Sequence, residues 1–313
     1  MNTKKPDLIF LGTPEFALPA LKALVENDFK PKLVITQPDQ PLGRHQKLSS
    51  SPVKVVAEKY GIRVIQPKNK KELAQIFAKE SCQVAVVVAY GMIIPDEILK
   101  KPAYGFLNIH PSLLPKYRGS SPIQAALLHG DLQTGVTIIK LTQRVDAGPI
   151  IGRQTFDIGS RNAAKLHDAL AQLGGELLVS VLPNYLAGKA ELIDQDDSQA
   201  TYTSLIRRED GLVDWNKTPL EIFNQFRAFT PWPGVFTYFD NKRLKILNLS
   251  VLEGDLSKDL SNGTVFLTPK KKLAVKCDNG AITLITVQLE GKKGVLAPEF
   301  LKGYPEIVGK RLG

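Results

Sequence analysis

Two short segments contain the side chains most suited to chemistry, and the first runs from Asn108 to Pro122. Asn108 and His110 are two positions apart on a predicted strand, so both side chains project from the same face of the sheet. An amide that donates a hydrogen bond and a neighbouring imidazole can together hold a carbonyl oxygen and handle a proton. Polar residues at a strand end also often only cap a loop, and this pair alone does not decide between the two interpretations.

The second segment is Asp146-Ala147-Gly148-Pro149, which follows a predicted strand over residues 135–141. Taken alone, an aspartate in such a position is best interpreted as a turn residue that bonds its own backbone. Next to His110, its carboxylate would hold the imidazole and adjust its pKa, or order a water that carries protons. The two segments together suggest a site that polarises a carbonyl group and transfers protons.

The sequence argues against several other kinds of site. Residues 12–14 separate a predicted strand from a helix, but they match neither the dinucleotide-binding nor the phosphate-binding glycine pattern. The four histidines form no cluster with Cys, Asp or Glu at the spacing of metal ligands, so we expect no metal. The two cysteines are far apart and suggest no disulfide framework, which fits a reducing compartment.

A doubly wound α/β domain would position these polar segments. Apolar runs alternate with helical patterns through the first half of the chain, which favours a mostly parallel sheet. The predicted strands cover residues 8–11, 33–35, 62–65, 84–89, 105–110 and 135–141. The run 84–89 is apolar without alternation, as expected for a strand covered on both faces. Such sheets bind ligands at the carboxyl ends of their strands, where both polar segments lie.

The last hundred residues show a different pattern of predicted secondary structure. Short predicted strands at 245–252, 263–268, 273–277 and 281–289 are separated by turn residues, and Asn279-Gly280 is a strong hairpin signal between two of them. This pattern predicts a small β-barrel, similar to an OB-fold. We therefore expect a catalytic domain over residues 1–187, a polar linker over 188–205 and a C-terminal β-barrel domain over 206–313.

The composition is that of an ordinary globular protein, with 43% hydrophobic and 23% charged residues. The apolar run near the N-terminus is too short for a signal peptide, and no run is long enough to span a membrane. We expect a cytoplasmic protein, and a monomer, because no coiled coil or long apolar edge demands an oligomer. The net charge of +10 is compatible with a polyanionic partner without establishing one.

The pattern Asn-x-His-x-Ser-Leu-Leu-Pro-x-Tyr-Arg-Gly, with Asp-Ala-Gly about 36 residues after the histidine, resembles the folate-dependent formyltransferase/hydrolase superfamily. The chain is most similar to the branch that formylates initiator methionyl-tRNA. That similarity extends over nearly the full chain and includes LGTPEF (11–16), TQPDQPLGRHQKL (36–48), SPVKV (51–55), VVVAYGMIIP (86–95) and RAFTPWP (227–233). The resemblance implies a Rossmann-like catalytic domain and 10-formyltetrahydrofolate as cosubstrate. It also implies transfer of the formyl group to the α-amino group of initiator methionyl-tRNA, for translation initiation.

The same resemblance implies roles for individual residues of the two polar segments. Asn108, His110 and Asp146 match the catalytic residues of the family. The turn formed by Ser112, Leu113, Leu114 and Pro115 matches the turn that contacts the folate.

For the tRNA substrate, the implied contacts come from both parts of the chain. Phe16 matches an aromatic residue that lines the pocket for the methionyl side chain. Arg44, with Lys47 nearby, matches a basic residue that reaches the acceptor end of the tRNA. Lys292 and Lys293 fall in a basic loop of the C-terminal domain, similar to one that meets the tRNA.

Three alternatives stay open at this point. The acceptor could be another amine used within the superfamily, such as a sugar nucleotide or glycinamide ribonucleotide. Water could replace the amine, which would make the protein a 10-formyltetrahydrofolate hydrolase with the same three polar residues. A non-catalytic RNA-binding protein that kept the fold is the third, but a pure binder has no use for Asn108, His110 and Asp146 together.

Overall fold

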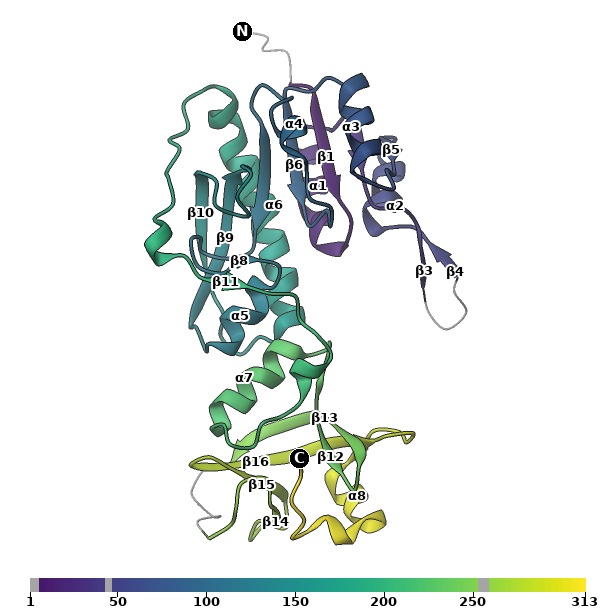
Figure 1. Ribbon diagram of the computed structural model, residues 1–313, viewed down its shortest axis with the longest axis vertical. Helices are drawn as coiled ribbons and strands as arrows, with labels where there is room; N and C mark the ends of the chain where they lie inside the picture. The colour runs from purple at the N-terminus through teal and green to yellow at the C-terminus, as the bar shows by residue number, and fades with distance from the viewer. Residues whose placement is uncertain (1–5, 43–46, 253–258) are drawn as a thin grey trace. The chain divides into compact units, whose positions relative to one another are not determined.

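The computed structural model describes residues 6–42, 47–252 and 259–313 (Figure 1). The chain forms two compact units. The first contains residues 1–122, 133–158 and 166–203, and the second contains 123–132, 159–165 and 204–313. Each unit has its own sheet. None of the helices in the described ranges combines the length and hydrophobicity that a membrane span requires.

The first unit is built on a seven-stranded sheet in the order β10-β9-β7-β6-β1-β2-β5. Its strands are β1 (Leu8–Gly12), β2 (Leu33–Ile35), β5 (Arg63–Ile65), β6 (Val84–Val88), β7 (Phe106–His110), β9 (Gln133–Lys140) and β10 (Ile150–Asp157). The first five are parallel, whereas β9 runs antiparallel to β7 and β10 runs antiparallel to β9. The predicted doubly wound, mostly parallel sheet is confirmed. The edge strand β10 was not among the predicted strands.

Helices cover both faces of this sheet. Leu73 and Phe77 of α3 (Lys70–Lys79) and Ile98 of α4 (Asp96–Leu99) pack in one core cluster with side chains of β1, β2 and β6. On the other face lie α1 (Leu18–Glu26) and α6 (Ala163–Leu186). A Cβ at Gly174 of α6 would lie 2.6 Å from the Ile109 side chain of β7. The glycine therefore lets α6 approach the sheet closely, next to the strand that carries Asn108 and His110.

The second unit contains an antiparallel sheet in the order β12-β13-β16-β15-β14, with β17 paired to β16. Its strands are β12 (Val235–Phe239), β13 (Lys242–Leu252), β14 (Val265–Leu267), β15 (Leu273–Cys277), β16 (Gly280–Leu289) and β17 (Val295–Leu296). The predicted hairpin at Asn279-Gly280 is confirmed, since Cys277 pairs with Gly280 and Asn279 has a left-handed φ of 53°. Register shifts near Asn248 bend the long strand β13.

In chain order, one helix precedes the strands of this sheet and another follows them. Helix α7 (Pro219–Phe229) begins with a reciprocal cap, in which Thr218 accepts from the Glu221 backbone and Glu221 accepts from the Thr218 backbone. Such caps satisfy donors that the first turn of a helix leaves free. Helix α8 (Ala297–Gly303) follows β17.

Candidate active site

Asn108 and His110 lie at the carboxyl end of β7, where open parallel sheets bind their ligands. Ile109 between them faces α6, so both polar side chains point to the opposite face. In the sheet, Asn108 is paired with Val87 of β6, and His110 is paired with Thr137 of β9. His110 is buried, whereas the Asn108 side chain is partly exposed. The same face of β7 thus presents a partly exposed amide and a buried imidazole.

The two ring nitrogens of His110 face different groups. Its Nε2 lies 2.9 Å from the carbonyl oxygen of Tyr117, and its Nδ1 lies 3.5 Å from Oδ2 of Asp146. A carbonyl oxygen can only accept, so Nε2 carries a proton, and in the neutral ring Nδ1 is the unprotonated atom that faces the carboxylate. Burial lowers the pKa of His110, although the Asp146 charge and the bond to Tyr117 partly offset this effect. The ring is therefore predominantly neutral near pH 7.

Asp146 lies in a tightly built turn after β9. Its φ of 49° falls in the left-handed region, and its Oδ2 accepts a hydrogen bond of 2.9 Å from the backbone amide of Gly119. Two residues later, a Cβ at Gly148 would lie 1.8 Å from the carbonyl oxygen of Lys140. Only glycine allows the chain to pass so close to β9. The Asp-Ala-Gly sequence is thus explained by a carboxylate that faces the histidine and a glycine that lets the turn close.

Hydrogen bonds from side chains of β9 and β10 fix the turn of residues 112–115. The buried hydroxyl of Thr137 donates to the Ser112 carbonyl oxygen at 2.7 Å and accepts from the Leu114 amide at 3.2 Å. Nη1 of Arg153 donates to the Leu114 carbonyl oxygen. Ser112 and Leu114 are fully buried, while Leu113 and Pro115 are partly exposed. A ligand at this turn would therefore meet the backbone and the side chains of Leu113 and Pro115.

One residue that contacts the Asp146 turn is not predicted by the sequence. Gln195 lies in the segment predicted as a linker, and its amide donates to the backbone oxygens of Asp146 and Gly148. Its residue type and its polar neighbours resemble an ordinary surface loop, so no local pattern marks it. Only the tertiary return of residues 190–203 to the first unit, for example through the pairing of Ile193 with Ile150, reveals the contact.

Among the residues predicted to meet tRNA in the first unit, Phe16 is buried, and its ring packs edge-to-face on His167 of α6 at a centroid distance of 5.1 Å. Arg44 lies outside the described residues. Lys47 begins β4 (Lys47–Ser49), which pairs with β3 (Gln40–Leu42) as a hairpin, but its side chain is not described. The segment around residues 36–48, expected as a loop, therefore contains two paired strands where it is described.

The base of this ribbon is tied to the first unit by a polar cluster. Oδ2 of Asp39 accepts from Nζ of Lys54 at 2.8 Å, and its Oδ1 accepts from Nε2 of Gln66 at 2.7 Å. Gln66 also donates to the Gln37 carbonyl oxygen. Lys54 and Gln66 hydrogen-bond to one another at 3.0 Å, so the cluster is closed. The pKa of Asp39 is lowered, chiefly by the hydrogen bond from Lys54.

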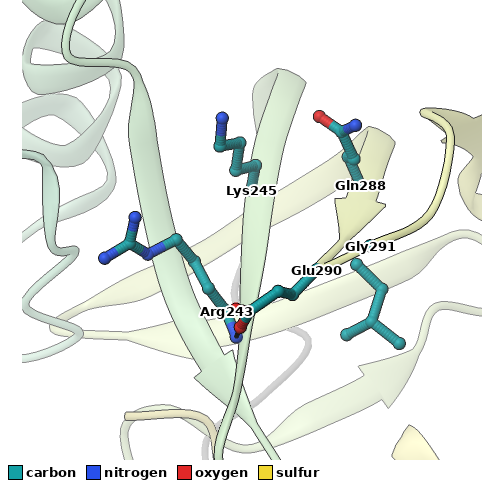
Figure 2. A pocket seen from close by; sticks show the side chains of 6 residues that line it. Arg243, Lys245, Gln288, Glu290 and Gly291 are labelled. Atoms are coloured by element: carbon teal, nitrogen blue, oxygen red, sulfur yellow. Dashed lines mark hydrogen bonds between the residues drawn. The ribbon is translucent and has the colours of Figure 1, made fainter.

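In the second unit, Lys292 and Lys293 are exposed on the turn after β16. Beside this turn lies a pocket of about 220 Å³ lined by Arg243, Lys245, Gln288, Leu289, Glu290 and Gly291 (Figure 2). Gln288 donates to the Lys292 carbonyl oxygen at 2.8 Å, which joins the pocket to the turn. The Arg243 guanidinium lies over the ring of Phe236 at 4.4 Å. Two basic side chains, Arg243 and Lys245, therefore line a pocket that also contains the acidic Glu290 and lies next to the turn of Lys292 and Lys293.

No group of three or more His, Cys, Asp and Glu side chains within the described ranges is arranged to hold a metal ion. The pair of His110 and Asp146 lacks a third such ligand in that part of the chain.

Comparison with known proteins gives matches over both units. A family model described as formyl transferase matches residues 7–182, and one described as formyl transferase, C-terminal domain, matches residues 205–305. Methionyl-tRNA formyltransferase from Geobacter sulfurreducens is 40% identical over 309 residues, covering 98% of this chain and 96% of that protein. The protein of the same name from Methylococcus capsulatus is 41% identical over 310 residues, covering 98% and 99%.

A solved structure gives the same fold at lower identity. The N-formyltransferase from Helicobacter canadensis, in complex with folinic acid and dTDP-3-aminofucose, matches with a TM-score of 0.68. The match covers 89% of this chain and 98% of that one, at 21% identity. At this identity the likeness concerns the fold alone.

Proposed function

The chain belongs to the formyl transferase family, and from this premise we propose that it transfers a formyl group from 10-formyltetrahydrofolate to the α-amino group of initiator methionyl-tRNA. Identity of about 40% over nearly the whole chain to proteins named methionyl-tRNA formyltransferase supports this acceptor over another amine. The observation that carries the proposal is the pairing of the buried His110 with the partly exposed Asp146, beside Asn108 at the carboxyl end of β7. A protein that only bound RNA would have no need of it.

In the proposed reaction, the neutral α-amine attacks the formyl carbon, and the carbonyl oxygen becomes an oxyanion. The partly exposed amide of Asn108 is suited to donate a hydrogen bond to that oxygen. Removing one such donor typically costs roughly a hundredfold or more in rate. The role of Asn108 is thus to stabilise charge that develops only in the transition state.

The proton lost by the attacking amine has to reach the folate nitrogen that departs. The neutral His110 ring accepts it at Nδ1, the atom that faces Asp146, and the Asp146 carboxylate stabilises the imidazolium so formed. The imidazolium then donates the proton to the departing nitrogen, directly or through a water. One proton leaves the amine and one arrives on the folate nitrogen, so no other reagent is consumed. The lowered pKa of His110 suits this role, because the ring starts neutral and gives the proton up readily.

The folate is proposed to lie against the turn of Ser112, Leu113, Leu114 and Pro115. The backbone of this turn is fixed by Thr137 and Arg153, so it offers a preformed surface. Preformed contacts avoid the entropic cost of ordering a loop on binding.

The tRNA is proposed to be bound through its phosphates by basic residues of both units. In the second unit, the proposed contacts are the exposed Lys292 and Lys293, together with Arg243 and Lys245 of the pocket beside their turn (Figure 2 shows the pocket). In the first unit, the proposed contacts are Arg44 and Lys47 at the ribbon of β3 and β4, and Phe16 near the methionyl side chain. Contacts of this kind give affinity that depends on salt and reads few bases.

One assay tests the proposal against its alternatives. The protein is incubated with 10-formyltetrahydrofolate, with and without charged initiator tRNA, while tetrahydrofolate release and formyl-methionine are both followed. We expect the two products to appear together and only with the charged tRNA. Release of tetrahydrofolate without tRNA would instead identify a hydrolase. Absence of any folate turnover would leave only the binding protein.

A further inference from the structure

We propose that Gln195 is a positioning residue for the Asp146 turn, and this proposal rests on the function proposed above. Its side chain uses its full hydrogen-bonding capacity. Nε2 donates to the carbonyl oxygens of Asp146 at 2.8 Å and Gly148 at 2.7 Å. Oε1 accepts from Nε of Arg118 at 3.0 Å and from Nη2 at 2.8 Å. An amide has two donor hydrogens and two acceptor lone pairs, so every one of them is occupied by the protein.

The orientation of the Gln195 amide is determined by Arg118. The guanidinium only donates and the two carbonyl oxygens only accept, so the reverse orientation would place like groups against each other at all four contacts. Arg118 itself is 1% exposed and is held by Asp197, whose Oδ1 accepts from Nη1 at 2.8 Å. A buried cation requires such complete pairing. The buried Arg118 therefore fixes the orientation of the Gln195 amide.

Arg118, Gln195, Asp197 and the backbone next to Arg118 together contact the Asp146 turn at several points. Gly119, next to Arg118, donates its backbone amide to the Asp146 carboxylate, and Gln195 holds the main chain on either side of Ala147. Asp197 also accepts from Nη2 of Arg144, at the start of the turn, at 2.7 Å. The side chain and the main chain of Asp146 are thus fixed by separate contacts.

Asp146 has a left-handed backbone conformation, which is unfavourable for most residues other than glycine. The hydrogen bonds to its side chain and main chain stabilise this conformation. Without the bonds from Gln195, the turn would be free to relax, and the carboxylate would leave its position 3.5 Å from Nδ1 of His110. A displacement of about 1 Å in a catalytic group can lower a rate about a hundredfold. Gln195 touches neither the carboxylate nor the imidazole, so its effect on catalysis passes through the turn.

Two substitutions separate this role from simple stability. Gln195→Glu keeps an oxygen for Arg118 and replaces only the donor that faces the two carbonyl oxygens. Gln195→Met is neutral and of similar length, and removes both sets of contacts. We expect kcat to fall about 10- to 100-fold in each, with KM for folate and tRNA within about twofold. The matched control is Gln199→Met, because Gln199 is exposed on the same segment and, among the described residues, its side chain bonds only Asp196.

A readout without substrate distinguishes failure of this proposal from failure of the proposed function. The Asp146 charge raises the pKa of His110, so displacement of the carboxylate in Gln195→Met should lower that pKa, as measured by NMR titration of the ring. Asp146→Asn should lower it as well, and combining the two should add little. Gln195→Met with an unchanged His110 titration and normal kcat would overturn the proposal. If Gln195→Met does not fold, the kcat of Gln195→Glu tests the proposal by itself. A kcat within twofold of the wild type would then contradict the positioning role of Gln195.

Discussion

His110 and Asp146 face each other across 3.5 Å, with the opposite nitrogen of the imidazole bound to the Tyr117 carbonyl oxygen. In the proposed mechanism, this relationship decides which nitrogen of His110 exchanges protons. Nε2 is occupied, so Nδ1 is left for exchange, and the carboxylate lies where it stabilises the protonated ring. In the proposed mechanism, His110 is therefore a base that begins neutral and becomes charged during the reaction.

Asp146→Asn should lower turnover by about 10² to 10⁴ and leave folate binding within a few-fold of the wild type. An amide oxygen can still accept from the Gly119 backbone, so the turn is kept, but the amide cannot stabilise an imidazolium. Single-turnover kinetics and calorimetric folate titration measure the two quantities. Asp194→Asn, at an exposed position, is the control. Near-normal turnover would remove Asp146 from the mechanism.

His110 should make the protein less stable as the pH falls. Burial lowers its pKa below the ordinary value of 6.5, so below that value the unfolded chain binds a proton that the folded chain does not. The free energy of unfolding therefore decreases with falling pH from about 6.5 down to the folded-state pKa, by up to about 1.4 kcal/mol per pH unit. Urea unfolding at pH 7.5 and 5.5 tests this. His110→Gln should show a smaller decrease, and an equal decrease in both proteins would contradict the account.

Thr137→Val should destabilise the folded protein by about 1–3 kcal/mol and weaken folate binding. The substitution leaves the Ser112 carbonyl and the Leu114 amide without their buried partner. Thr134→Val on the same strand is the matched control. Thr134 is also buried, but within the described part of the chain its hydroxyl has no hydrogen-bond partner, so its removal should be neutral or stabilising. Denaturant unfolding compares the two, and equal costs would argue against the role given to Thr137.

Gly148→Ala should displace the Asp146 turn and reduce both stability and turnover. The added methyl group would lie 1.8 Å from the Lys140 carbonyl oxygen, which is backbone and has to move as a whole. Such overpacking typically costs about 1–3 kcal/mol. Gly303→Ala is the control, because a Cβ there meets nothing within 4 Å. Thermal unfolding and kcat of the two variants, measured side by side, should differ clearly; a Gly148→Ala protein with wild-type values would show that the turn adapts.

Replacing Lys292 and Lys293 together by Gln should raise KM for the tRNA and leave kcat nearly unchanged. For every phosphate that the variant no longer neutralises, the slope of log affinity against log salt should also become shallower by about 0.7 to 0.9. Lys270 and Lys271, on the exposed turn between β14 and β15, provide a control with the same change in charge. Filter binding at several salt concentrations gives the slopes. Equal effects of the two double substitutions would mean that only net charge matters.

The parts of the fold that sequence predicts well are those where local pattern and tertiary role agree. The unbroken apolar run of β6 is buried at all five positions, and Asn279-Gly280 is a hairpin turn. The strand β10 was missed because Arg153, Gln154 and Thr155 are exposed at the sheet edge, which weakens the apolar signal of a strand.

The same contrast applies to the site. Asn108, His110 and Asp146 could be proposed from residue type, spacing and resemblance. The tautomer of His110 could not, because it depends on the Tyr117 carbonyl, a backbone atom that any residue would supply. Gln195 was missed for a related reason, since its partners are backbone oxygens 49 and 47 positions earlier in the chain.

That separation along the chain has a consequence for biosynthesis. A nascent polypeptide that has left the ribosome only as far as the end of α6, at Leu186, already contains the three polar residues of the site but not the amide that restrains their turn. On the proposal for Gln195, the Asp146 turn would be restrained only once the segment that carries Gln195 has emerged and returned to the sheet. This can happen while residues 204–313 of the second unit are still to be synthesised.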